Sequence, residues 1–135
     1  MAVMKEMVLY YQPEKDKAAG NATKAAKLKG VLIRMGIRIK NIQADQVGQT
    51  VGYLAGYDGY EENSEEESLP VLEEEMLVMK GFSNRRLDEL LLNLKKAGVP
   101  KIALKAVITE SNLDWKFSDL YLELKEEHKT MSKKD

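Results

Sequence analysis

The stretch Glu75-Met76-Leu77-Val78-Met79 decides the fold, because it repeats Glu6-Met7-Val8-Leu9-Tyr10 from the start of the chain. In both copies a short apolar run leads to a helical stripe, a glycine and a second β-rich run. The stripe and its glycine recur at an offset of 62 positions, with Ala25, Leu28, Leu32 and Gly36 answered by Leu87, Leu90, Leu94 and Gly98. Such a repeat predicts one pseudo-symmetric α/β domain whose halves bury each other's apolar faces.

Strands and helices are expected to alternate, which gives a strand–helix unit four times, (βα)x4. Two runs without polar alternation, 7–11 and 76–79, are typical of interior strands. Two others are typical of edge strands, namely 37–42 and 101–108, the second of which is opened by Pro100. The predicted helices cover 22–35, 46–55, 84–97 and 114–128, and the inward face of the third includes Leu91 beside Leu87, Leu90 and Leu94. Gly48, Gly52 and Gly56 weaken the second helix, since each costs about 1 kcal/mol relative to alanine. Their spacing indicates close packing or an irregular helix.

Two topologies place two interior strands between two edge strands. We favour an open parallel sheet in the order 2-1-3-4 with helices on both faces, because a helical link between the second and third strands favours a parallel crossover. The alternative is a ferredoxin-like split βαβ arrangement with an extra helix between its halves. Either way we expect a single domain over residues 1–135, with pseudo-repeats at about 6–57 and 75–128 joined by a mobile acidic segment at 58–74.

The charge of the chain is segregated along its length. Residues 1–57 carry nine Lys/Arg against four Asp/Glu, residues 58–75 carry nine acids and no base, and residues 76–135 carry twelve bases against nine acids. Without the acidic segment the net charge would be +8 instead of −1. Residues 61–68 hold five glutamates and no apolar residue, so they cannot repay an ordering entropy of about 1–2 kcal/mol per residue. Mobility is therefore expected at 61–70.

Composition excludes several classes of protein. The chain has no cysteine, which rules out disulfide frameworks, thiolate zinc sites and cysteine nucleophiles. It has no apolar run near the roughly 20 residues of a membrane span, and its start is unlike a signal peptide. We expect a cytoplasmic protein that does not bind membranes. The single histidine, His128, lies near a predicted helix end, and the acidic run lacks the EF-hand pattern. No catalytic residue, metal site or cofactor is predicted.

The loop Thr109-Glu110-Ser111-Asn112 is the predicted ligand-binding site. It follows a strand and precedes a helix, where open α/β sheets bind their ligands. Its hydroxyls, carboxylate and amide can form several hydrogen bonds, and a helix N-terminus attracts anions. The same residue types also serve as turn and capping residues, so a purely structural role is the competing interpretation.

Four segments resemble a known family: LIRMGIRIKNI (32–42), QTVGYLAGY (49–57), KAGVPKIALKAVIT (96–109) and the W-x-F-x-x-L-x-x-E-L-x-x-E-H pattern from Trp115 to His128. The chain is similar, roughly from Met7 to His128, to small uncharacterised bacterial proteins that share a domain of unknown function. The resemblance implies a bacterial cytosolic protein. It implies no activity, substrate, cofactor or site residue.

A non-enzymatic module that binds a small ligand or a protein partner, with a regulatory role, is therefore the leading hypothesis. Nothing in the sequence assembles a nucleophile, a base and an orienting group. One alternative is a nucleic-acid-associated protein that uses the basic helix face (Lys24, Lys27, Lys29 and Arg34) and is masked by the acidic loop. Another is a small enzyme of unknown reaction centred on the loop from Thr109 to Asn112.

Overall fold

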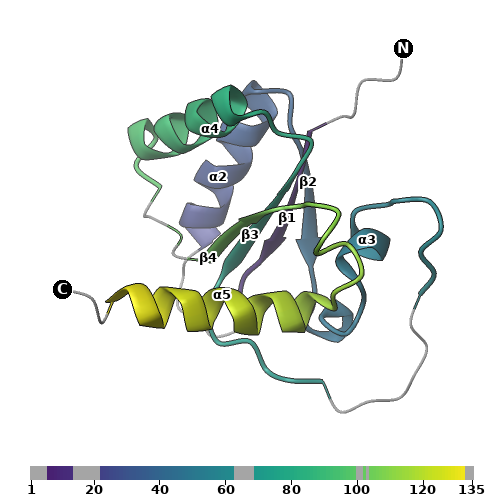
Figure 1. Ribbon diagram of the computed structural model, residues 1–135. Helices are drawn as coiled ribbons and strands as arrows, with labels where there is room; N and C mark the ends of the chain where they lie inside the picture. The colour runs from purple at the N-terminus through teal and green to yellow at the C-terminus, as the bar shows by residue number, and fades with distance from the viewer. Residues whose placement is uncertain (1–5, 14–21, 63–68, 100–101, 103, 133–135) are drawn as a thin grey trace.

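The protein has an α/β fold built on an open four-stranded sheet (Figure 1). A computed structural model describes residues 6–13, 22–62, 69–99, 102 and 104–132. The strands lie in the order β2-β1-β3-β4, where β1 is Met7–Tyr11, β2 is Arg38–Ile42, β3 is Met76–Lys80 and β4 is Leu104–Val107. The fold class, the four strands and their order are as predicted from the sequence.

The pairing of the strands differs from both predicted topologies, from the parallel sheet in direction and from the split βαβ arrangement in order. β1 is parallel to β2 and β3 is parallel to β4, but β1 and β3 are antiparallel, with Leu9 opposite Val78 at the centre of the pair. The all-parallel sheet is wrong, since β3 starts at the end of the sheet where β2 stops. In the described residues of the link from β2 to β3, the 3-10 turn η1 (Ala44–Gln46) and the one-turn helix α3 (Val51–Leu54) form no helix long enough to cross the sheet. The split βαβ alternative is also wrong, since the strands within each unit are direct neighbours.

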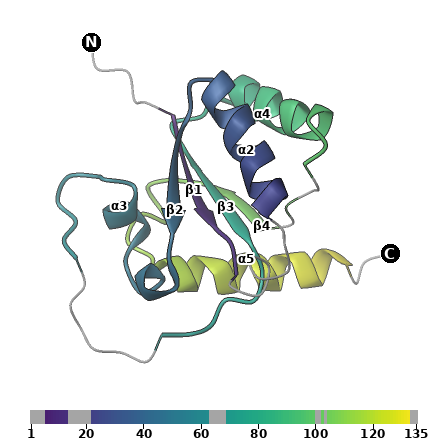
Figure 2. The ribbon, with the colours of Figure 1, turned by 180° about the vertical axis from the view of Figure 1, so that it is seen from behind.

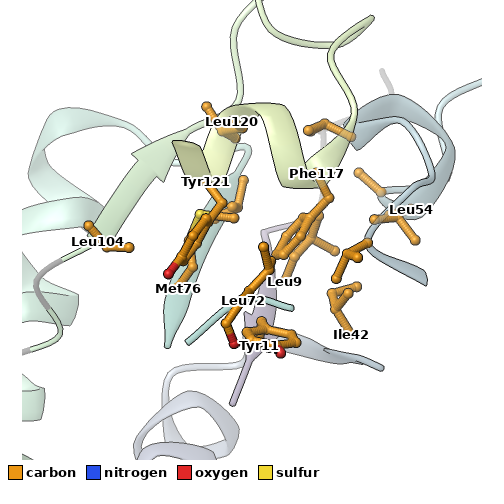
Figure 3. Packing of buried hydrophobic residues seen from close by; sticks show 14 residues of the cluster. Leu9, Tyr11, Ile42, Leu54, Leu72, Met76, Leu104, Phe117, Leu120 and Tyr121 are labelled. Atoms are coloured by element: carbon orange, nitrogen blue, oxygen red, sulfur yellow. Dashed lines mark hydrogen bonds between the residues drawn. The ribbon is translucent and has the colours of Figure 1, made fainter. Parts of the chain in front are cut away.

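The helices cover both faces of the sheet (Figures 1 and 2). α2 (Ala22–Arg34) and α4 (Asn84–Lys96) lie together on one face, and α5 (Phe117–Ser132) lies with α3 on the other. Figure 3 shows the α5 face, where Phe117 and Tyr121 point onto the sheet between Leu104 and Leu54. The interior strands β1 and β3 are therefore covered on both faces, which explains their lack of polar alternation.

The α4 stripe is largely confirmed as core. Leu90 is completely buried and Leu94 nearly so, both on the α2 side of the sheet. Leu91, which was expected to face inward with them, is 37% exposed. This one leucine lies at the border of the buried stripe.

The two strand–helix–strand units end their helices in the same way. α2 and α4 each have 13 residues and are offset by 62 positions. Each is followed by a glycine in the left-handed region, Gly36 at φ 72° and Gly98 at φ 79°, where other L-residues are strained. These matched ends agree with the predicted pseudo-repeats at about 6–57 and 75–128, although the duplication itself stays a prediction.

The predicted helix over 46–55 is shortened to α3, and two of its glycines permit close packing, as expected. A Cβ at Gly48 would lie 2.7 Å from Leu69 Cδ2, and one at Gly52 would lie 2.8 Å from the Tyr60 ring. Neither contact is possible for a residue with a side chain. The segment after β2 therefore packs closely against Tyr60 and Leu69, and α3 is terminated by Gly56, whose φ of 80° is left-handed.

The starts of α3 and α5 satisfy each other's backbone groups. Residues 47–52 and 113–118 run side by side, joined by an antiparallel bridge between Thr50 and Lys116. Four N–H···O=C bonds of 2.8–2.9 Å connect the two segments: Val51 to Trp115, Gly52 to Leu113, Phe117 to Gln49 and Ser118 to Val47. Each helix start thus finds partners in the other segment for N–H groups that lack one within their own helix.

Two lysines hold the C-terminal end of α3. Lys40 of β2 donates to the Leu54 carbonyl at 2.9 Å, and Lys80 of β3 donates to the Ala55 carbonyl at 2.8 Å. Lys80 also lies 4.5 Å from the centre of the Tyr57 ring. Positive charge at a helix C-terminus is favourable, and burial raises the pKa of the Tyr57 phenol above its usual range. The inward-pointing Lys40 also makes edge strand β2 a poor template for another strand.

Arg86 of α4 ties the two units together. Its guanidinium binds both carboxylate oxygens of Glu6, before β1, at 2.7 and 2.8 Å. It also donates to Glu89 at 3.0 Å and to the Met35 carbonyl, just after α2, at 2.8 Å. The hydrogen bonds to Glu6 raise the pKa of Arg86 further above its ordinary value. A fork-shaped donor suits this bidentate arrangement better than a lysine would.

Two predictions concern regions that the structure only partly describes. Most of the stretch expected to be mobile, 61–70, falls on residues 63–68, which lie outside the described residues. Across the described residues, no helix has the length and apolar character needed to cross a bilayer.

Candidate ligand-binding site

The predicted loop from Thr109 to Asn112 follows β4 and is closed by Asn112. The Asn112 side-chain oxygen accepts from the Thr109 N–H at 2.9 Å, and its amide nitrogen donates to the Val107 carbonyl at 3.1 Å. The Trp115 N–H then donates to the Asn112 carbonyl at 3.1 Å. Asn112 is thus used as a turn residue, as the competing interpretation from sequence expected.

The remaining loop groups face solvent. Thr109, Glu110 and Ser111 are exposed, and they offer two hydroxyls and a carboxylate. The first N–H groups of α5, at Phe117 and Ser118, already donate to carbonyls of the 47–49 segment. They are therefore not available to an anion. The loop can form hydrogen bonds with a ligand, and its assignment as a binding site stays a prediction.

Strand direction also weakens the reason for choosing this loop. Because β1 and β3 are antiparallel, the carboxyl ends of β1 and β2 lie at one end of the sheet and those of β3 and β4 at the other. The usual rule places ligands where the carboxyl ends of a parallel sheet meet. Here only two strands contribute such ends at either side.

A pocket of about 390 Å³ lies between the outer flank of α4 and the start of β4. Leu77, Leu94, Val99 and Ile102 form a buried aliphatic lining, and exposed Leu91 lies at its surface. Two lysines complete the lining, exposed Lys95 on α4 and half-buried Lys105 on β4. The Lys105 ammonium donates to the Ile102 carbonyl. We refer to this feature as the α4–β4 pocket.

The α4–β4 pocket combines an apolar interior with a few polar groups, as small-molecule sites usually do. Its volume also lies within the range of about 300–1,000 Å³ typical of ligand pockets. Among the described lining residues, the two lysine ammonium groups are the only titratable groups. Chemically, the aliphatic lining can hold an apolar group of a ligand, and the lysine ammonium groups can pair with a negative charge on the same ligand.

Sequence reasoning missed these residues. The sequence predicts Leu91 on the inward face of its helix and Ile102 in an edge strand over 101–108. One pattern could have indicated the pocket. A fourth leucine, Leu91, borders the stripe on α4, and Lys95 follows it one helical turn later. The cavity itself depends on the distance between α4 and β4, which the sequence does not give.

The other candidate groups do not assemble into a reactive site. His128 is exposed on α5, 11 residues beyond Phe117, which at 1.5 Å per residue places it roughly 16 Å along the helix from the loop. Among the described residues, no three side chains of the His, Cys, Asp or Glu type come together as a metal site.

Comparison with known proteins gives one match. Residues 75–131 match the family described as Domain of unknown function (DUF3783). The matched segment contains β3, α4, β4 and nearly all of α5, and with them the whole α4–β4 pocket. The resemblance to a domain of unknown function is therefore confirmed for the second half of the chain, whereas a bacterial source stays an expectation. No curated protein and no solved structure matches this chain.

Proposed function

We propose that the protein is a non-enzymatic binding module that holds the aliphatic part of an anionic ligand in the α4–β4 pocket. One observation carries this proposal: a pocket of about 390 Å³ with aliphatic walls and two lysines. Burial of apolar surface supplies most of the affinity, at about 25 cal/mol per Å² removed from water. The ammonium groups of Lys95 and Lys105 select a negatively charged head group.

The arrangement of the pocket residues supports binding more than catalysis. Catalysis needs groups that stabilise developing charge or move a proton at a reacting atom. The described side chains around this pocket are aliphatic, apart from the two lysines. They can orient a ligand by its head group while its chain lies against Leu91 and Leu94.

Decanoate is a suitable probe, because it joins an aliphatic chain to one carboxylate. We expect it to bind with one-to-one stoichiometry in calorimetry, and decyltrimethylammonium, which has the opposite charge, to bind more weakly. Absence of decanoate binding to the wild-type chain at millimolar concentration would overturn the proposal.

Neighbouring residues on α4 provide matched controls. Leu91→Asp introduces a charge at the pocket and should abolish decanoate binding, while Leu92→Asp, at a position 52% exposed and outside the lining, should leave it unchanged. Lys95→Gln should weaken binding by about 1.5- to 5-fold, the effect of an exposed ion pair. Lys96→Gln, which does not line this pocket, should have no effect. Equal effects of the two leucine variants would place the ligand elsewhere.

A further inference from the structure

A second hollow, of about 320 Å³, lies between the C-terminal ends of α2 and α4. Its six lining residues form three pairs, each separated by 62 positions: Val31 with Asn93, Arg34 with Lys96, and Met35 with Ala97. β1 and β3 pair antiparallel beneath these helices, so the hollow lies on the approximate two-fold axis that relates the two units. We call it the α2–α4 groove.

Both helices that form the groove close their own C-terminal ends. After α2, the Gly36 and Ile37 N–H groups donate to the Ile33 and Leu32 carbonyls at 3.1 and 2.9 Å. After α4, Gly98 and Val99 donate in the same way to Lys95 and Leu94 at 3.1 and 3.0 Å. This double closure is the Schellman motif. Two carbonyls at the end of each helix thus have backbone partners, and the Met35 carbonyl is bound by Arg86.

Arg34 and Lys96 line the groove with their charged side chains. Both are exposed, and within the described part of the chain neither side chain forms a hydrogen bond or an ion pair. No described lining residue is acidic. Glu89, one turn before Asn93 on α4, is already bound by Arg85 and Arg86.

Asn93 adds an uncharged donor to the groove. Its amide nitrogen lies 3.4 Å from the Met35 sulfur, which is a weak acceptor. An amide nitrogen carries two hydrogens, so one remains for a ligand oxygen. The groove thus offers a guanidinium, an ammonium and an amide, all of them donors.

We propose that the α2–α4 groove binds a small molecule that carries two linked phosphoryl groups. The guanidinium of Arg34 matches phosphate oxygens with two parallel hydrogen bonds, and Lys96 acts as a compact point charge. Cations on opposite walls, related by the approximate two-fold axis, suit a ligand with two equivalent anionic ends. This inference is independent of the α4–β4 pocket, because the two lining sets have no residue in common.

Pyrophosphate is the direct probe, with inorganic phosphate for comparison. Isothermal titration at low ionic strength should show one pyrophosphate per chain, bound more tightly than phosphate. Arg34→Gln and Lys96→Gln should each weaken binding by about 1.5- to 5-fold, and the double variant by the product of the two factors. Lys95→Gln is the matched control, since Lys95 is the exposed neighbour of Lys96 but lines the other pocket. It should leave pyrophosphate binding unchanged.

Three results would overturn the inference. The first is no binding of pyrophosphate to the wild-type chain. The second is an equal effect of Lys95→Gln and Lys96→Gln, which would indicate attraction by general surface charge. The third is binding of a single-stranded polynucleotide that requires Arg34 and Lys96 and is not displaced by pyrophosphate. This result would make the face a nucleic-acid surface. Decanoate binding should be the same in all these variants except Lys95→Gln, so failure here leaves the proposed function intact.

Discussion

Replacing Gly52 with alanine should destabilise the protein, although alanine is the better helix former. A Cβ on residue 52 would lie 2.8 Å from three atoms of the Tyr60 ring, well inside the roughly 3.5–4.0 Å optimum for carbon atoms. The ring cannot withdraw freely, because its hydroxyl donates to Asp114 Oδ1 at 2.6 Å. The substitution must therefore move the ring and disturb this hydrogen bond.

The expected magnitude follows from two opposing terms. Alanine gains up to about 1 kcal/mol over glycine within a helix. Overpacking at a buried position such as Gly52 costs about 1–3 kcal/mol, because neighbouring side chains are forced out of their rotamers. The net result for Gly52→Ala is a loss of about 0–3 kcal/mol in the free energy of unfolding.

Urea unfolding of a double-mutant cycle isolates the role of the ring. In a Tyr60→Ala background the obstacle is gone, so Gly52→Ala should change sign and stabilise by up to about 1 kcal/mol. Gly30→Ala is the matched control, because a Cβ at Gly30 of α2 would meet nothing within 4 Å, and it should stabilise the wild-type chain. If Gly52→Ala stabilises the wild-type chain as much as Gly30→Ala does, the close-contact argument is wrong.

Three further expectations rest on separate features. Leu90→Ala should lower the free energy of unfolding by about 2–5 kcal/mol because this leucine is completely buried. The control Leu92→Ala should change it by less than about 0.5 kcal/mol. A loss below about 1 kcal/mol for Leu90→Ala would contradict the assignment of Leu90 to the core. Arg86→Met should cost about 1–3 kcal/mol in urea unfolding, since it leaves the largely buried Glu6 without its bidentate partner, and unchanged stability would show that the pair contributes nothing. Burial raises the pKa of the Tyr57 phenol above its value of 10.0 in the unfolded chain, so the phenol stays protonated to a higher pH in the folded state. The free energy of unfolding should therefore fall as pH rises beyond about 10. Melting temperatures should fall less steeply above that pH in Tyr57→Phe, and an identical pH profile of the two proteins would refute the assignment.

The sequence predicted those parts of the fold that depend on local pattern. The α4 stripe, the glycine stops at Gly36 and Gly98 and the doubly buried β1 and β3 all leave periodic traces. Strand direction leaves none, because Val8 and Leu9 are buried on opposite faces whichever way a neighbour runs. The antiparallel pairing accompanies the connection after β2, where α3 is a single turn terminated by Gly56 with a left-handed φ of 80°.

The candidate site was less predictable for a related reason. The loop at Thr109 was chosen for its place in the chain, and its location after β4 is as predicted. The α4–β4 pocket and the α2–α4 groove arise from distances between helices and strands instead. Arg34 and Lys96 are 62 residues apart, and no local pattern shows that they line one hollow.

The backbone exchange between residues 47–52 and 113–118 has a consequence for how the protein opens. The amides of Val51 and Gly52 are protected by carbonyls near α5, and those of Phe117 and Ser118 by carbonyls near α3. None of the four can meet solvent unless both segments separate, so their hydrogen exchange should share one opening free energy. The N-terminal end of α5 lies within the segment that matches the family, and residues 47–52 lie outside it. The stability of this helix end against local opening therefore depends on a contact with residues outside the matched segment.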